Sequence, residues 1–237
     1  MGVRERMPPA EPLSARSAGL LAGLAVALAA LTALVASGAL TRVDQFGIDH
    51  FMPWFVPGNP GRVESTINSF WRPFRLHTAN GAKLLDLWTY PCSVVVSGVI
   101  MVVAFVLLRR RLGAAAALAP AAVWVVGNAI EVLGKDVITR PTLYGVANGA
   151  RVAVIPYFHS FPSGHMMRGV IVAYTVFLLW SRAKWWATVW VVLVAPALVV
   201  TAAHTPSDVV GGALLGVILL IPTHAVVRGA RMEHVTG

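Results

Sequence analysis

Two short polar segments of the chain carry side-chain types that can handle phosphate. One reads Phe-Pro-Ser-Gly-His and ends at His165; the other reads His-Thr-Pro-Ser-Asp and runs from His204 to Asp208. Each stands at the start of a long apolar run, and its serine, glycine or proline suits the first residues of a helix. The unpaired N–H groups and partial positive charge of a helix N-terminus favour an anion such as phosphate. Both segments are therefore candidate phosphate sites, and each adds a histidine.

The spacing of His204 and Asp208 predicts an activated nucleophile. Because the two residues are about one helical turn apart, the carboxylate can accept a hydrogen bond from one ring nitrogen and leave the other nitrogen basic. A second imidazole, His165, can protonate the oxygen that leaves when phosphorus is attacked. The three side chains together could transfer a phosphoryl group.

Positive charge for the phosphate comes from residues that surround these segments. Lys135 and Arg140 precede both of them, and the backbone N–H groups around Ser163 and Gly164 add further donors. These groups would neutralise the equatorial oxygens as charge redistributes in the transition state. Phosphoryl transfer of this kind depends mainly on positioning and electrostatics.

Each of these residues also has a non-catalytic interpretation. Asp208 can complement the dipole of a helix, and Ser163 can cap one. Lys135 and Arg140 can extend along apolar surface to the membrane–water boundary. The conjunction of two histidines, a spaced carboxylate and two cations favours one composite site.

The composition places the chain in a membrane. Of its 237 residues, 57% are hydrophobic and 12% charged, with a mean hydropathy of +0.72, which is too apolar for a soluble domain of this length. The formal net charge of +9 comes from short Lys and Arg clusters between apolar runs. A basic face interleaved with aromatic residues, which nucleic acid would need, is absent from the sequence pattern. We therefore expect membrane lipids and a phosphorylated substrate as partners, and no nucleic acid.

Six apolar runs predict an all-α integral membrane fold with six transmembrane helices, since about 20 apolar residues span a bilayer. The runs cover residues 17–41, 87–108, 112–130, 162–181, 185–203 and 209–227. Residues 1–16 are expected to be a cytoplasmic tail, and 17–237 a single six-helix membrane domain whose first helix is not cleaved as a signal peptide. Segment 42–85 mixes aromatic and basic residues, which predicts a short interfacial helical segment between the first and second transmembrane helices.

The distribution of basic residues predicts the orientation. With six crossings, one side receives the N-terminal arginines, Arg109–Arg111, Arg182 with Lys184, and Arg228 with Arg231. By the positive-inside rule that side is cytoplasmic. Both histidine segments and the two cations then lie together on the outer face. We therefore expect a multi-pass protein of the inner (plasma) membrane whose site faces the periplasm or exterior.

The order of these motifs resembles a known family. Lys…Arg-Pro, Pro-Ser-Gly-His and His-x3-Asp, spread over six hydrophobic helices, resemble the type 2 phosphatidic acid phosphatase (PAP2) superfamily of membrane lipid phosphatases. In that family the histidine of the third motif forms a phosphohistidine, its aspartate orients it, and the histidine of the second motif is the general acid. The resemblance assigns these roles to His204, Asp208 and His165.

The resemblance also matches phosphate-binding positions, with two departures. Lys135, Ser163 and Gly164 match the family pattern, which implies no metal and no other cofactor. Thr142, however, stands where the first motif places its arginine, and Leu198 where the third motif places another. Each lost charge-assisted contact would weaken transition-state binding by roughly 2–4 kcal/mol.

Other arginines are candidates to replace the two that are missing. We expect Arg140 to substitute for the first of them. Arg168 is the preferred substitute for the second, because positions 164, 165 and 168 can share one helical face. Arg151, in the preceding loop, is the other candidate.

The sequence therefore predicts a metal-independent phosphatase. Its substrate would be a membrane lipid phosphate, either a polyprenyl phosphate or diphosphate or a glycerolipid phosphate. Two alternatives stay open: a lipid-linked phosphotransferase that passes the phosphoryl group to an acceptor other than water, and a catalytically weakened lipid-phosphate binding protein. A transport pore is disfavoured, because Arg168, the one charge within an apolar run, lies near the end of that run.

Overall fold

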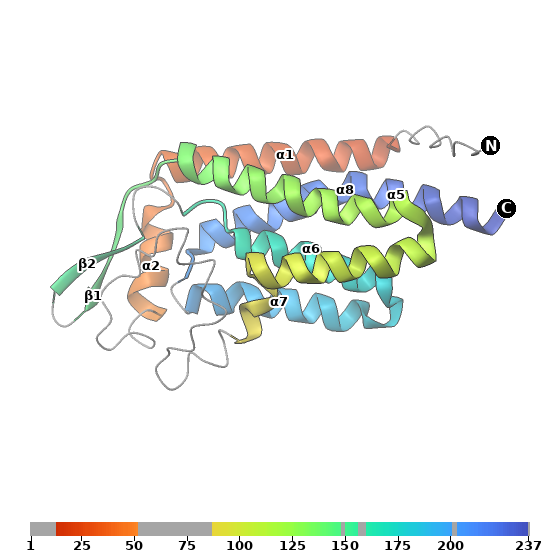
Figure 1. Ribbon diagram of the computed structural model, residues 1–237. Coiled ribbons are helices and arrows are strands. Elements are labelled where there is room, and N and C mark those ends of the chain that lie inside the picture. Colours follow the sequence, from red (N-terminus) through yellow and green to blue (C-terminus); the bar gives the residue numbers. More distant parts are fainter. Residues whose placement is uncertain (1–12, 52–86, 148–149, 156–159, 201–202, 237) are drawn as a thin grey trace.

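The computed structural model of the chain is a bundle of long helices that run side by side, with smaller elements gathered at one end (Figure 1). It describes residues 13–51, 87–147, 150–155, 160–200 and 203–236. The helices are α1 (Ala15–Ala36), α2 (Thr41–Phe51), α5 (Val94–Val137), α6 (Gly164–Leu179), α7 (Lys184–Val200) and α8 (Pro206–Thr236). Two short 3-10 helices, η3 (Tyr90–Cys92) and η4 (Ser181–Ala183), and two strands, β1 (Leu143–Ala147) and β2 (Ala150–Ile155), complete the described part of the chain.

Helix α5 consists of two arms that meet at Gly113. This glycine has φ 83° and ψ 174°, a conformation that a residue with a side chain rarely adopts. The chain reverses there, so that the two arms run antiparallel (Figure 1). The predicted spans 87–108 and 112–130 lie largely in these two arms.

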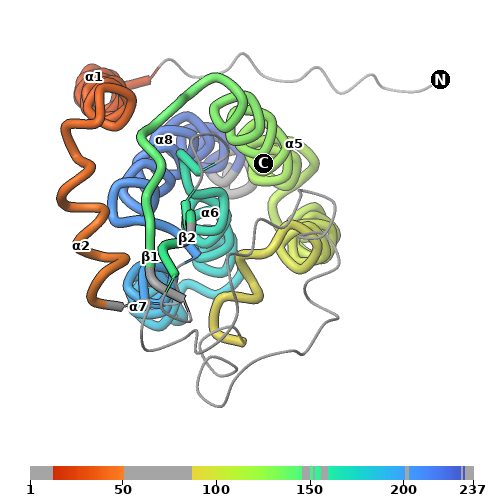
Figure 2. Tube along the Cα trace, turned by 90° about the vertical axis from the view of Figure 1, so that its left-hand side faces the viewer, coloured from red at the N-terminus to blue at the C-terminus, as the bar shows by residue number. Residues whose placement is uncertain are grey.

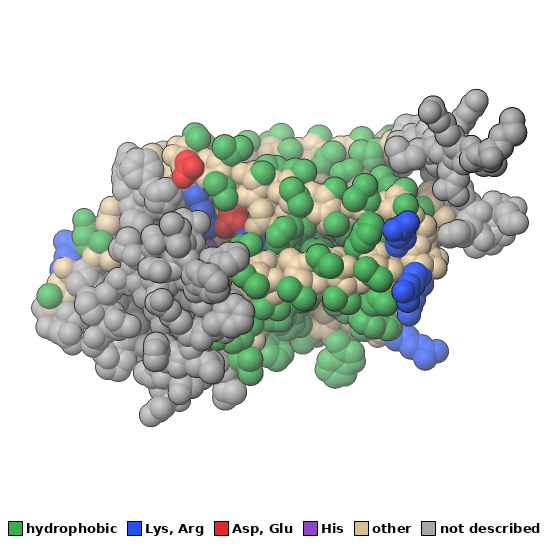
Figure 3. Space-filling model, viewed as in Figure 1, with side chains coloured by type: hydrophobic (Ala, Val, Ile, Leu, Met, Phe, Trp, Pro, Cys, Tyr) green, Lys and Arg blue, Asp and Glu red, His purple; other side chains and the backbone are tan. Residues whose placement is uncertain are grey.

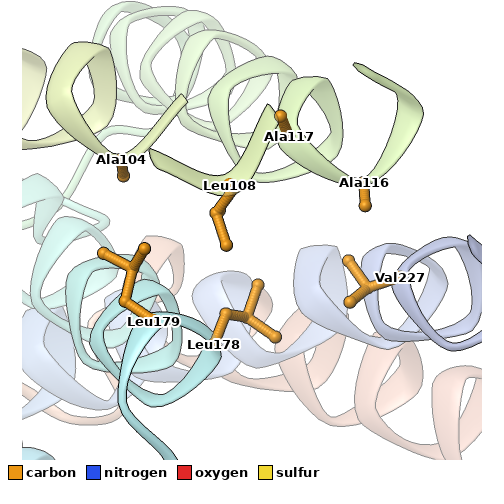
Figure 4. Close-up of a cluster of buried hydrophobic side chains, with 7 residues drawn as sticks. All are labelled: Ala104, Leu108, Ala116, Ala117, Leu178, Leu179 and Val227. Atoms are coloured by element: carbon orange, nitrogen blue, oxygen red, sulfur yellow. The ribbon is translucent and has the colours of Figure 1, made fainter. Parts of the chain in front are cut away.

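A buried apolar cluster holds the bend of α5 against α6 and α8. Leu108, from the first arm, and Ala116, from the second, face Leu178 of α6 and Val227 of α8 (Figure 4). Near the same bend, Arg111 donates a hydrogen bond to the carbonyl of Leu179 at 2.8 Å. The bend and the C-terminal end of α6 therefore lie at the same end of the bundle.

Three helices of the described chain are long and apolar enough to cross a membrane by length and composition. They cover Ala15–Ala36, Ser181–Val200 and Pro206–Ala230, while the apolar helix Gly164–Leu179 is shorter. Apolar side chains cover the outside of the bundle between its two ends (Figure 3). Such a surface is stable when lipid covers it. The prediction of a helical membrane protein is confirmed, whereas the count of six transmembrane helices stays a prediction.

The segment between α5 and α6 corrects the all-α prediction. It forms an antiparallel hairpin in which Leu143 pairs with Ile155 and Ala147 with Ala150. The two strands are rich in Val, Ile, Leu and Tyr, which favour a pleated, half-buried surface. The charged residues among 135–161 obscure this strand pattern in the sequence. A short helix after the first transmembrane segment was predicted, and α2 occupies that place; the remainder of segment 42–85, from residue 52, lies outside the described residues.

Helix α6 lies at the centre of the bundle, with α5, α7 and α8 around it and α1 at the periphery (Figure 2). Its N-terminal end is at the end where α2 and the β hairpin gather (Figure 1). The residues that open α6 and α8 are therefore enclosed by several elements, which is where the predicted site residues fall.

Candidate active site

Helices α6 and α8 begin side by side. The side chain of Ser163 caps α6, its Oγ accepting a hydrogen bond from the N–H of Met166 at 3.3 Å. The backbone N–H of Ser163 donates to the carbonyl of Asp208 at 2.9 Å, so one bond joins the two helix starts. A Cβ at Gly212 of α8 would overlap the carbonyl of Ser163, so this close approach requires glycine.

The two predicted catalytic histidines face each other across these helix starts. The ring centroids of His165 and His204 are 5.8 Å apart, with their planes at 56°. Both rings can thus contact one phosphate group. Their separation agrees with the composite site that the sequence predicts.

His204 has the electrostatic environment of a neutral nucleophile. Its Nδ1 lies 3.8 Å from Oδ2 of Asp208, which is longer than a hydrogen bond. Burial lowers the pKa of His204 from its ordinary value of 6.5, and this effect exceeds the opposing attraction of the Asp208 carboxylate. The ring is therefore uncharged at neutral pH, with a lone pair that can attack phosphorus.

Asp208 is held by several donors in a fully buried position. Its Oδ1 accepts a hydrogen bond from Nη1 of Arg140 at 2.9 Å. Its Oδ2 accepts from Oγ of Ser160 at 2.6 Å and from the backbone N–H of Thr205 at 3.1 Å. These bonds fix the orientation of the carboxylate that faces His204.

Arg140 lies between two buried carboxylates. Besides its bond to Asp208, its Nη2 donates to Oδ2 of Asp44 on α2 at 2.7 Å. Asp44 also accepts from the N–H and Oγ of Ser207, at 3.0 and 2.7 Å. The guanidinium and both carboxylates are almost completely buried. We call Asp44, Arg140 and Asp208 the carboxylate-arginine chain.

The contacts of Arg140 bear on its predicted role. We expected this arginine to contact the phosphate, but its described partners are carboxylates and hydroxyl groups, including Oγ1 of Thr205 at 3.0 Å. Taking a guanidinium and two carboxylates out of water is costly, and their mutual hydrogen bonds offset that cost. The geometry therefore favours Arg140 as a positioning residue that acts through Asp208.

A second group of charges lies beside the first turn of α6. Glu131, on α5, binds Nζ of Lys135 with Oε1 at 2.6 Å and Nη1 of Arg168 with Oε2 at 2.5 Å. Arg168 also donates from Nε to the carbonyl of Cys92 at 2.6 Å and from Nη1 to Oδ1 of Asn128 at 2.8 Å. We call Lys135, Glu131 and Arg168 the lysine-glutamate-arginine group.

Gly164 brings this second group into contact with the helix start. A Cβ built on Gly164 would overlap the carboxyl group of Glu131. The glycine is thus needed because a charged side chain packs directly on the backbone of α6, next to Ser163 and His165. Lys135 keeps 24% of its side chain exposed, whereas Glu131 and Arg168 are buried.

Comparison with known proteins identifies the family. A family model described as the PAP2 superfamily matches residues 116–232, which include both histidine segments, Lys135 and Arg140. Residues 116–232 belong to the PAP2 superfamily.

A solved PAP2 structure has the same fold. It is the crystal structure of a transmembrane PAP2-type phosphatidylglycerolphosphate phosphatase from Bacillus subtilis, 17% identical, with a TM-score of 0.59. The match covers 90% of this chain and 96% of that chain. At this identity the likeness shows a common fold alone. No curated protein matches the sequence.

The structure places all predicted site residues at one end of the PAP2 bundle. They are His165, His204, Asp208, Lys135, Arg140, Ser163, Gly164 and Arg168. Their chemical roles stay predictions. Among the described residues, no group of three or more His, Cys, Asp and Glu side chains is arranged to hold a metal ion.

Three residues of the candidate site are not predicted from the sequence: Glu131, Ser160 and Asp44. Glu131 carried a readable signal, because it stands four positions before Lys135 and such pairs meet on a helix. Ser160 directly precedes the Phe-Pro-Ser-Gly-His segment, but serine before a motif is not distinctive. Asp44 had no signal, since its partners are 96 and 163 positions away in the chain.

Proposed function

We propose that the chain is a lipid phosphatase that releases phosphate from a membrane lipid phosphate. The observation that carries this proposal is the 5.8 Å separation of the His165 and His204 rings, with the Asp208 carboxylate 3.8 Å from Nδ1 of His204. Membership of the PAP2 superfamily and the apolar helices support a substrate that stays in the bilayer.

The first chemical step would be attack by His204. The free nitrogen of its neutral ring, Nε2, forms a bond to phosphorus as the bond from phosphorus to the lipid oxygen breaks. His165 transfers a proton to that oxygen, so the lipid leaves as an alcohol or as the shortened phosphate. Asp208 stabilises the positive charge that develops on the ring of His204.

The second step would be hydrolysis of the phosphohistidine. His165, now neutral, takes a proton from a water molecule as the water oxygen bonds to phosphorus. The bond between phosphorus and Nε2 breaks, its electrons return to the ring, and inorganic phosphate leaves. Lys135, Arg168 and the N–H groups that open α6 would stabilise the negative charge of both transition states.

The side of the membrane on which this occurs follows from the charge distribution. The bend of α5, which follows Arg109–Arg111, lies at the end of the bundle opposite the site, next to the C-terminal end of α6. Figure 3 shows a group of Lys and Arg side chains at that end. By the positive-inside rule that end is cytoplasmic, so the site would face the periplasm or exterior of the inner membrane.

The substrate classes that we propose are polyprenyl phosphates or diphosphates and glycerolipid phosphates. The second class agrees with the structurally similar Bacillus subtilis protein, which is a phosphatidylglycerolphosphate phosphatase. The experiment is release of inorganic phosphate from a panel of both classes by the purified protein in lipid–detergent micelles, with and without EDTA.

His204→Ala and a matched control test the proposal. His224 lies on the same helix, α8, and contacts Tyr174 rather than the site, so His224→Ala is the control. We expect His204→Ala to abolish phosphate release and the control to keep it. An acid-labile phosphoprotein that forms with wild type and not with His204→Ala would support the intermediate. Equal turnover by wild type and His204→Ala would refute the proposal, and label that reaches a sugar or lipid acceptor would indicate a phosphotransferase.

A further inference from the structure

We propose that Glu131 competes with phosphate for the cations of the site. Its carboxylate occupies the place in which a phosphate would meet Lys135, Arg168 and the N-terminus of α6. The phosphate and this carboxylate therefore exclude each other, and the side chain of Glu131 returns when inorganic phosphate leaves. This inference rests on the proposed function, because it concerns the same anion site.

The contacts of Glu131 are those expected of a bound anion. One carboxylate oxygen binds Nζ of Lys135 at 2.6 Å, and the other binds Nη1 of Arg168 at 2.5 Å. The two cations come from different helices, α5 and α6, as they would around a tetrahedral oxyanion. Glu131 is 6% exposed, so this charge sits inside the bundle rather than on its surface.

The position of the carboxylate coincides with the helix start of the proposed site. It packs on the Cα of Gly164, where any Cβ would overlap it. The N–H groups of the first turn of α6 point in the direction that favours an anion. His165 follows Gly164 directly, and Glu131 and His204 interact electrostatically. The carboxylate thus lies at the helix start that carries His165, within electrostatic range of His204.

The charge balance explains why the carboxylate must move. In the described residues of the site, the cations Lys135, Arg140 and Arg168 face the carboxylates of Asp44, Glu131 and Asp208. These six charges sum to zero, so a protonated His165 would be the one net positive charge that a phosphate dianion meets. When Glu131 moves away, Lys135 and Arg168 become available to the phosphate oxygens. A phosphate bound by the partly exposed Lys135 and the buried Arg168 would otherwise leave slowly, and the returning carboxylate weakens that binding.

The alternative is that Glu131 only braces the two cations. Asn128 makes this alternative testable, because its Oδ1 also holds Nη1 of Arg168 and carries no charge. If Glu131 is a brace, Glu131→Gln and Asn128→Ala both loosen Arg168 and both weaken phosphate binding. If Glu131 competes with phosphate, Glu131→Gln has the opposite effect from Asn128→Ala.

The experiment measures binding of inorganic phosphate to the purified full-length protein. Affinity is obtained by titration calorimetry and, where turnover is measurable, as the inhibition constant of phosphate. We expect Glu131→Gln to bind phosphate at least about tenfold more tightly than wild type, a change of about 1.4 kcal/mol. We expect Asn128→Ala to bind it no more tightly than wild type. Unchanged or weaker binding by Glu131→Gln would overturn the inference.

A second measurement uses the wild-type protein and does not depend on whether the variant folds. In a structure determined with phosphate or vanadate bound beside His204, the carboxylate oxygens of Glu131 must have left Lys135 and Arg168. An anion bound there with both contacts intact would overturn the inference. Because phosphate binding is measured without turnover, a protein that behaves as expected here but hydrolyses no lipid phosphate would refute only the proposed function.

Discussion

Asp44→Asn tests whether the carboxylate-arginine chain positions the catalytic histidine. The substitution keeps the size of the side chain and an oxygen that can accept from Ser207, but it removes the negative charge that lies 2.7 Å from Arg140. Breaking a buried ion pair costs about 3–5 kcal/mol. We expect the lower end, about 3 kcal/mol, because Arg140 keeps its bond to Asp208 at 2.9 Å.

The effect on catalysis follows from the geometry of Asp208. With Asp44 neutralised, Arg140 has one carboxylate left, and a shift of the guanidinium moves Asp208 and then the ring of His204. A displacement of about 1 Å can lower the rate about 100-fold, so we expect kcat to fall by about 10- to 100-fold while KM stays near its wild-type value. Steady-state phosphate release gives both constants, and thermal unfolding in detergent gives the loss of stability.

The control and the contradicting results use the same helix. Asp49 is exposed on α2, where it accepts a hydrogen bond from Gln45 of the same helix, so Asp49→Asn should behave as wild type. If Asp44→Asn raised KM and the inhibition constant of phosphate without lowering kcat, Arg140 would contact the phosphate itself. If both variants behaved as wild type, the positioning role would be wrong.

Two further predictions concern His204 and Gly164. Burial lowers the pKa of His204, and only the neutral ring can attack phosphorus, so activity should be present above this lowered pKa and be lost as the pH falls through it. In a profile of kcat/KM against pH, the acidic limb that reports protonation of His204 should therefore lie below pH 6.5. A His204 limb above pH 6.5 would contradict this. Gly164→Ala forces the Glu131 carboxyl group away from the helix start, which should cost about 1–3 kcal/mol of stability in thermal unfolding. Gly19→Ala, on α1 where a Cβ meets nothing within 4 Å, is the control, and an equal response of the two variants would argue against the packing.

Local sequence patterns were sufficient to predict which residues meet. His165 stands near the start of the apolar run 162–181, and His204 directly follows the run 185–203. If each run crosses the membrane once, the two histidines lie at the same end of the bundle. The His204 and Asp208 pair depends only on helical spacing, which is a local property. Those predictions agree with the 5.8 Å separation of the rings.

Residues whose role depends on tertiary contacts were not predictable in the same way. For Arg140 the sequence pattern gives the charge, and hence the prediction of a phosphate contact, but not the partners. Those partners include Asp44, on a helix that the sequence placed at the membrane surface, and burial of both charges depends on how α2 packs against the start of α8. The hairpin of β1 and β2 was missed for a similar reason, since its strands lie in a segment in which charged residues outweighed a short alternating pattern.

The length of α6 has a consequence for how a lipid reaches the histidines. This central helix has 16 residues and is therefore about 24 Å long, some 6 Å less than a hydrocarbon layer of about 30 Å. In the proposed orientation, with the C-terminal end of α6 level with the cytoplasmic boundary, its N-terminal end would stop below the opposite head-group plane. The reaction would then take place in a recess beneath the outer surface of the bilayer, and the phosphate, rather than the acyl or isoprenoid tail, would be the part of the lipid that travels.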